Sequence, residues 1–188
     1  MQYFQVLCDN VHHADRWHLD EPLDASREIV ELDLFIMGSK YDGPSPRTIS
    51  INKKYPGRPI KFTLDLFDVP VVTPEIGDIL QEVAGDDIER FPVMVGADYC
   101  QLEIVNVTRW LDCIDLKRSY CEVADDDSDN NRVRLYRVVS PLFVDASRSQ
   151  GRHIFRLRGW PVPLIVSNTV RDRLVGIPNL GVVFQPVS

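Results

Sequence analysis

The residue types that could hold a metal ion or catalyse a reaction are few and scattered in this sequence. Cys8, His12 and His13 form a group of potential metal ligands near the start of the chain. A structural zinc ion needs four such ligands, and no second pair follows at a recognised spacing. We therefore interpret this group as a surface turn and expect no metal ion there.

Two other reactive side chains are isolated from any partner in the sequence. His153 falls on the apolar side of a predicted strand, where a packed, hydrogen-bonded histidine is more common than a catalytic base. Cys113 follows Trp110 and precedes Ile114, which favours a buried thiol. The chain also lacks a nucleophile elbow, a P-loop, a dinucleotide fingerprint and an H-E-x-x-H motif. We expect no enzymatic activity and no cofactor.

Arginine is concentrated near the C-terminus. The segment from Arg132 to Arg173 holds nine arginines and two acidic residues. Some of these arginines share the face of a predicted strand and could bind phosphates as a ladder: Arg132 with Arg134, and Arg156 with Arg158. We favour the interpretation that the arginines neutralise an acidic N-terminal half across the sheet. A nucleic-acid-binding or nucleic-acid-processing domain using this cluster is the alternative function.

Charge is unevenly distributed along the 188 residues. The net charge is −7, and residues 1–94 carry nine basic and 17 acidic side chains, whereas residues 95–188 carry 12 and 11. Such acidity opposes general affinity for nucleic acid and favours a basic protein partner. The bland interpretation, that acidity only maintains solubility, stays open at this point.

Acidic side chains gather in two segments that could contact such a partner. Residues 125–131 have the oxygen density of a cation loop but lack the glycine and glutamate of an EF-hand, so a solvated loop is expected. Its functional alternative is an acidic finger that enters a basic groove of another protein. The second segment follows the first predicted helix. Together the candidate contacts are Asp86, Asp87, Glu89, Asp125, Asp126, Asp127 and Asp129.

Composition indicates a globular protein of one domain, residues 1–188, with possible halves at 1–94 and 95–188. Hydrophobic residues make up 44% and charged residues 26% of the chain. No apolar run approaches the roughly 20 residues needed to cross a bilayer, and the first residues lack the features of a signal peptide. We expect a cytoplasmic protein without a membrane partner.

The clearest element is a helix over residues 74–84. Thr73 can cap it, Pro74 fits the first helical position, and Gly85 suits the end. A second helix should begin after Ser167. Each helix is flanked by apolar strands, with a phenylalanine 18 residues after Thr73 and 17 after Ser167. We infer two related strand–helix–strand units in an α+β fold with few helices and a mixed, mostly antiparallel sheet.

The stretch 153–167 organises the second unit. Alternating residues predict a half-buried strand that carries Phe155, and Gly159, Trp160 and Pro161 then break the pattern. Trp160 is expected to be a core anchor where strand, turn and helix meet. Residues 31–37 alternate weakly and predict a further strand.

These motifs resemble an immunity-protein family that accompanies toxins in bacterial polymorphic-toxin systems. The most specific is Ile-Phe-Arg-Leu-x-Gly-Trp-Pro at residues 154–161. Supporting segments lie at residues 57–63, 69–73, 111–115 and 183–187.

The resemblance implies a small cytoplasmic protein that binds a cognate toxin domain and blocks it without chemistry of its own. Toxins paired with such families are often nucleases, whose sites are lined with lysine and arginine, and an acidic inhibitor would suit them. The shared motifs are mostly apolar, so Phe155, Gly159, Trp160 and Pro161 are expected to specify the scaffold. The toxin contacts are expected on polar loops.

Overall fold

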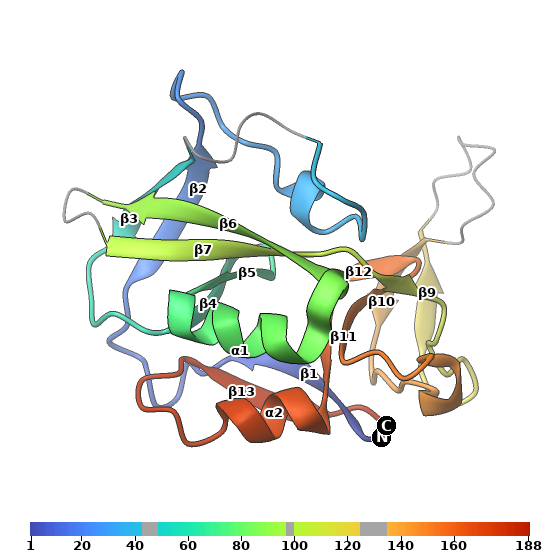
Figure 1. Cartoon of the computed structure of the whole chain (residues 1–188). Coiled ribbons are helices and arrows are strands. Elements are labelled where there is room, and N and C mark those ends of the chain that lie inside the picture. Colours follow the sequence, from blue (N-terminus) through green and yellow to red (C-terminus); the bar gives the residue numbers. More distant parts are fainter. Residues whose placement is uncertain (43–48, 97–99, 125–134) are drawn as a thin grey trace.

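The computed structural model describes the chain except for residues 43–48, 97–99 and 125–134. Over the described residues the fold is α+β, with mostly antiparallel sheets, as the sequence predicts (Figure 1). The six-stranded sheet has the order β2-β3-β6-β7-β5-β4. Its strands are β2 (His18–Leu23), β3 (Ser50–Tyr55), β6 (Ile88–Val95), β7 (Cys100–Val107), β5 (Val69–Val72) and β4 (Phe62–Leu66).

A five-stranded sheet of order β13-β1-β12-β11-β8 and a two-stranded ribbon complete the strands of the described part. The five-stranded sheet contains β13 (Val182–Pro186), β1 (Tyr3–Cys8), β12 (Trp160–Ser167), β11 (Ile154–Leu157) and β8 (Trp110–Leu111). The ribbon pairs β9 (Cys121–Val123) with β10 (Tyr136–Val139).

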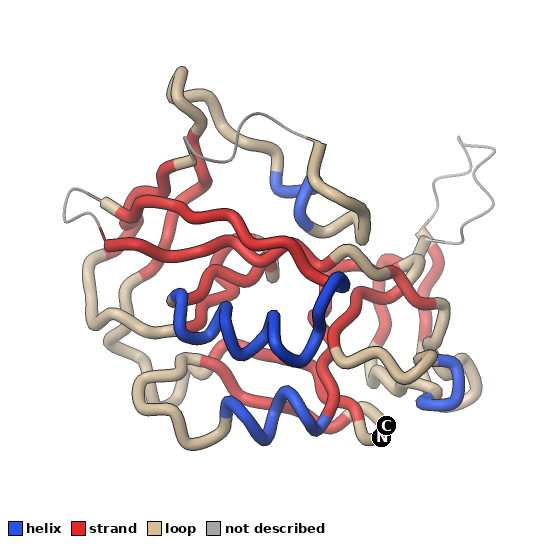
Figure 2. The backbone as a smooth tube through the Cα atoms, in the orientation of Figure 1, coloured by secondary structure: helices blue, strands red, loops and turns tan. Residues whose placement is uncertain are grey.

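The two α-helices lie next to each other, one on each large sheet (Figure 2). Helix α1 (Pro74–Ala84) packs on the six-stranded sheet, and α2 (Asn168–Leu174) packs on the five-stranded sheet. Leu80 of α1 and Leu174 of α2 join one buried cluster with residues of both sheets, among them Val105 and Val166. This cluster, which we call the shared core, joins the two sheets into one body.

The strand–helix–strand units predicted from the sequence are present and have the same topology. In the first, β5 and β6 are parallel to each other because each pairs antiparallel with β7 between them. In the second, β12 and β13 are likewise separated by β1, which pairs antiparallel with both. Each unit therefore takes its middle strand from elsewhere in the chain.

The predicted helix starts are correct, but their caps differ in detail. Ser167 Oγ accepts a hydrogen bond from the backbone N–H of Val170. Thr73 occupies the equivalent position with extended backbone, yet its hydroxyl caps nothing and is buried without a partner in the described part. Pro74 at the first helical position leaves one fewer N–H to satisfy there.

Two local predictions are wrong. Residues 31–37 form no strand and contain the 3₁₀ helix η1 (Leu32–Phe35), because Phe35 turns inward and stacks on Tyr41 at 4.9 Å between ring centroids. Strand β11 is buried along its whole length and is not half-buried. Its sheet is covered by the shared core on one face and, on the other, by a cluster that includes Phe155 and Leu111.

No helix in the described part of the chain is long and apolar enough to span a bilayer.

The connection from α2 to β13 ties the second unit to the six-stranded sheet. The carbonyls of Asn179 and Leu180 accept hydrogen bonds from the N–H groups of Lys61 and Phe62. Gly181 has a φ of +93°, and a Cβ there would lie 2.6 Å from the Phe62 carbonyl oxygen. This close approach between backbones leaves no room for a side chain.

We expect Gly181→Ala to destabilise the protein more than Gly176→Ala. Gly176 has a φ of +92° but open space around its Cβ position, so its substitution costs only the backbone term of about 1–2 kcal/mol. At Gly181 the steric clash adds to that term, for about 2–5 kcal/mol in total. Urea unfolding of the two variants measures the difference, and equal losses would contradict the close packing of this connection on β4.

Candidate functional site

The acidic segment after α1 is largely built into the fold. Asp87 ends the 3₁₀ helix η3 (Gly85–Asp87), and only 3% of its surface is exposed. Its Oδ1 lies 2.6 Å from Arg109 Nε and 3.0 Å from Arg152 Nη1. Asp87 thus joins the end of α1 to the strand connections before β8 and β11.

The neighbouring carboxylates differ in how far they reach the surface. Glu89 is partly buried, and its Oε2 accepts hydrogen bonds from the backbone N–H of Tyr41 at 2.8 Å and from Asn106 Nδ2 at 3.0 Å. Asp86 is exposed, and its backbone carbonyl accepts a hydrogen bond from Thr108 Oγ1. Within this segment, Asp86 has the carboxylate most available to a partner.

The second acidic segment cannot be placed in the same way. Asp125, Asp126, Asp127 and Asp129 lie outside the described residues. The strands before and after them, β9 and β10, pair antiparallel, with Tyr136 opposite Val123.

The arginines of the C-terminal half are largely engaged in contacts within the protein. Several of them reach residues of the first 94: Arg109 and Arg152 pair with Asp87, Arg173 pairs with Glu82, and Arg156 donates a hydrogen bond to the Asp68 carbonyl. Others pair within the C-terminal half, as Arg137 with Glu122, Arg148 with Asp112, and Arg171 with Asp172. The favoured interpretation, neutralisation of the acidic half, agrees with the ion pairs that Arg109, Arg152 and Arg173 form with Asp87 and Glu82.

The predicted phosphate-binding ladder is not present in the described residues. Arg156 and Arg158 were expected on one strand face, but Arg156 is fully buried and Arg158 follows the end of β11 in an exposed turn. Arg132 and Arg134 lie outside the described residues. The described arginines therefore provide no surface ladder for nucleic acid.

Arg156 links the two large sheets from inside. Its Nη1 donates a hydrogen bond to the Val162 carbonyl, and its Nη2 donates one of 2.6 Å to the carbonyl of Asp68, between β4 and β5. Burial lowers the pKa of Arg156 to about 10, although the nearby Asp68 opposes this. Burial also raises the pKa of the Asp68 carboxyl, which the positive charge of Arg156 partly offsets. At neutral pH the guanidinium remains charged and holds two carbonyls.

The remaining residues of the 154–161 motif also shape the scaffold. Phe155 is fully buried, with its ring edge-on to Tyr3 at 5.3 Å between centroids. Gly159 has a φ of +85°, and its carbonyl accepts a hydrogen bond from the N–H of Tyr136 on the ribbon. Trp160 is half-buried against the outer cluster of the five-stranded sheet, beside Pro161. At the turn, Trp160 and Pro161 are therefore half-buried, and Arg158 is exposed.

The isolated histidine and cysteine occupy structural positions. His153 Nδ1 lies 2.9 Å from Ser167 Oγ, so the two side chains share a hydrogen bond. Cys113 is fully buried, and this burial raises the pKa of its thiol to about 12, which keeps the thiol protonated. Both positions agree with the sequence interpretation.

Cys8 ends strand β1, and residues 10–15, which include His12 and His13, form the expected turn. His12 is exposed and hydrogen-bonds Asp9 at 2.9 Å, and its backbone N–H is the largest cause of the lowered pKa of Asp9. In the described ranges, no three or more His, Cys, Asp or Glu side chains are placed to hold a metal ion.

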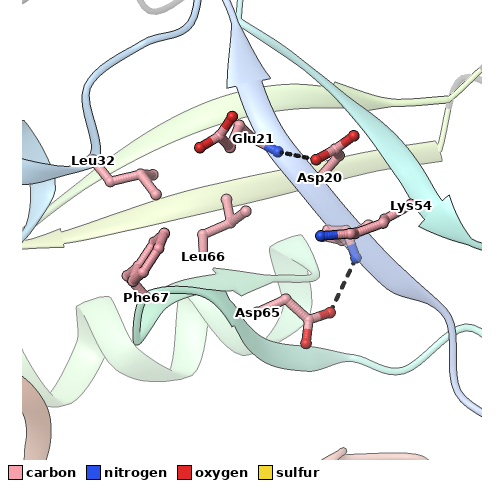
Figure 3. A pocket seen from close by; sticks show the side chains of 8 residues that line it. Asp20, Glu21, Leu32, Lys54, Asp65, Leu66 and Phe67 are labelled. Atoms are coloured by element: carbon pink, nitrogen blue, oxygen red, sulfur yellow. Dashed lines mark hydrogen bonds between the residues drawn. The ribbon is translucent and has the colours of Figure 1, made fainter.

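Sequence reasoning missed a surface groove at the seam where the edge strands β2 and β4 approach each other (Figure 3). The groove has a volume of about 310 Å³. We call it the seam groove and define it by its lining residues: Leu19, Asp20, Glu21, Leu32, Lys54, Asp65, Leu66 and Phe67. They come from four separate segments, so no local motif indicates the groove. The one local signal is Phe67-Asp68, an unusual pair in a two-residue hairpin connection.

We expect Asp87→Asn to lower stability by about 1–3 kcal/mol, because two arginines would lose their buried charged acceptor. Asp86→Asn removes the same charge from an exposed position and should change stability by less than about 0.5 kcal/mol. Thermal and urea unfolding of both variants provide the comparison. Equal effects would show that Asp87 has no special structural role.

We expect Arg156→Lys to destabilise the protein by about 1–3 kcal/mol although it keeps the charge, because one ammonium group cannot replace the fork that reaches both carbonyls. Arg158→Lys, the same change in an exposed turn, should alter stability by less than about 0.5 kcal/mol. Urea unfolding of the two variants measures the difference in their free energies of unfolding. Similar values for the two variants would refute the structural role of Arg156.

Comparison with known families finds a match in the C-terminal part of the chain. Residues 99–188 match the model of the Immunity protein family (Imm11). No curated protein matches the chain. The matched region runs from β7 to β13 and contains the whole 154–161 motif, whereas the supporting segments 57–63 and 69–73 lie before it. This match supports the resemblance seen in the sequence: residues 99–188 are similar to the Imm11 immunity protein family.

Proposed function

We propose that this protein is a cytoplasmic immunity protein that binds a cognate bacterial toxin domain and neutralises it by stoichiometric inhibition. The observation that carries the proposal is the match of residues 99–188 to the Imm11 family. In this proposal the protein performs no chemistry itself. The buried Cys113 thiol and the hydrogen-bonded His153 fit that role, since both side chains serve the scaffold.

The whole chain, residues 1–188, would act as one immunity domain. The family match covers the second half alone, but the shared core contains residues of both halves, and Arg152 and Arg156 contact the first half directly. A toxin-binding surface supported by such a body would be rigid before the toxin arrives, which lowers the entropic cost of binding.

The toxin would present a basic surface, as the active site of a nuclease does. The protein carries a net charge of −7, and many of its described arginines are already paired with its own acidic groups. Unpaired surface carboxylates would then steer a basic partner into the complex.

The proposed contacts are the two acidic segments. Asp86 would meet the toxin directly, whereas Asp87 and Glu89 would hold that segment in shape through their internal hydrogen bonds. Asp125, Asp126, Asp127 and Asp129 would form the second part of the surface.

The test is binding to the toxin domain encoded by the neighbouring open reading frame, measured by stopped-flow fluorescence. We expect a 1:1 complex whose association rate falls steeply with added salt. Replacing Asp86 and the four aspartates of residues 125–129 with lysine should slow association by about tenfold or more. Lysine at Glu75 and Glu82 on α1, with fewer changed charges, is the control for general effects of charge.

Two results would count against the proposal. Absence of any complex between the wild-type protein and the neighbouring toxin would remove its basis. A complex whose association rate is the same for the wild type and the five-aspartate variant would reject this placement of the contact surface, although the inhibitory function would stand.

A further inference from the structure

Phe67 is the most exposed aromatic side chain in the described part of the chain, with 70% of its surface accessible. It stands at one end of the seam groove, next to Leu66 and opposite Leu32 of η1 (Figure 3). An exposed ring beside a groove lined by both charged and apolar side chains can provide one side of a contact with another molecule.

The backbone holds Phe67 in place against its own conformational preference. Phe67 and Asp68 have φ values of +48° and +61°, as a type I′ turn requires, and this turn favours Asn-Gly over a bulky residue. The Asp68 carbonyl accepts a hydrogen bond from Arg156, which anchors the turn to the five-stranded sheet. The ring is therefore presented at a fixed position on a strained but well-supported turn.

The carboxylates around the groove differ in whether they are already paired with a basic side chain of the protein. Asp65 is neutralised by Arg16, whose Nη2 lies 2.6 Å from Asp65 Oδ1 within a buried pair. Burial raises the pKa of the Asp65 carboxyl, but hydrogen bonds from Arg16 and the Leu19 N–H, together with the charge of Arg16, outweigh burial, so the pKa is lowered. Asp20 and Glu21 are exposed and have no ion-pair partner in the described part of the chain. They leave the rim acidic despite Lys54 on β3.

We propose that the seam groove receives an arginine side chain of the toxin, an inference that rests on the proposed function and adds a named contact to it. A guanidinium can lie over the ring of Phe67 while it donates forked hydrogen bonds to a carboxylate such as Asp20 or Glu21. Its methylene stem would pack on Leu32 and Leu66. A carboxylate or phosphate of a partner would instead be repelled by this rim.

The groove was not among the contacts expected from the sequence, so its contribution can be separated from that of Asp86. Phe67→Ala should weaken binding of the neighbouring toxin by about 30-fold, the effect of a central aromatic contact. Asp20→Asn with Glu21→Gln should weaken it by about tenfold. Glu75→Gln with Glu82→Gln, which removes the same two charges from the exposed face of α1, should leave the dissociation constant within about twofold.

Two further variants test whether toxin binding depends on the charge of the groove and on the Phe67 ring as proposed. Lys54→Met removes a positive charge from the groove and should tighten binding. Phe67→Gly removes the ring but suits the positive φ, so it should raise the melting temperature while it weakens toxin binding. Loss of binding in a variant that folds more stably separates the contact role of Phe67 from any structural role.

A small probe tests the groove without the toxin. N-acetyl-arginine methylamide, titrated into the labelled protein, should shift the amide NMR signals of Leu19–Glu21 and Leu66–Phe67, and its uncharged citrulline analogue should not. A wild-type protein that binds no toxin but shows the arginine-dependent shifts would refute the proposed function alone. Toxin binding unaffected by Phe67→Ala and by the Asp20/Glu21 variant would refute the groove and leave the function standing.

Discussion

The fold depends on a charge carried into its interior. Arg156 lies on β11, next to the edge strand β8, and its guanidinium holds the Val162 carbonyl of its own sheet and the Asp68 carbonyl at the β4–β5 turn of the other sheet. Burying a guanidinium is costly unless its donors are satisfied. Two backbone carbonyls are fixed acceptors for the Nη groups of Arg156, whereas its Nε is buried without a hydrogen-bond partner in the described part of the chain. The arrangement therefore sets the position of the β4–β5 turn relative to the five-stranded sheet, and with it the position of Phe67.

The topology of the two strand–helix–strand units explains why neither unit can form its sheet alone. Each unit borrows its middle strand, β7 in the first and β1 in the second. The borrowed strand β1 comes from the N-terminus and completes a sheet made of C-terminal strands. Because α1 and α2 meet in the shared core, the apolar faces of both units are buried by each other. The body is thus formed by contacts distant in sequence.

The sequence predicted those features that are coded locally. Helix 74–84 and its proline start are marked by a local pattern, and the structure confirms them. What failed depends on tertiary partners. Phe35 could be assigned to a 3₁₀ turn only by knowing that Tyr41 stacks on it. The burial of Arg156 required the second sheet, and the seam groove required four separate segments to meet.

The buried and the exposed residues contribute differently to the specificity of toxin binding. Motif residues of the matched region 99–188, such as Phe155 and Arg156, are buried in the interior. They cannot contact a toxin and therefore cannot distinguish one toxin from another. Surface carboxylates and the exposed ring of Phe67 contribute little to the core and can change without unfolding the protein. A scaffold fixed from within by a buried cation therefore permits its outer surface to be adapted to a new partner while the fold is kept. Such a division of roles would suit the proposed function, because specificity for one toxin could then be set by surface residues alone.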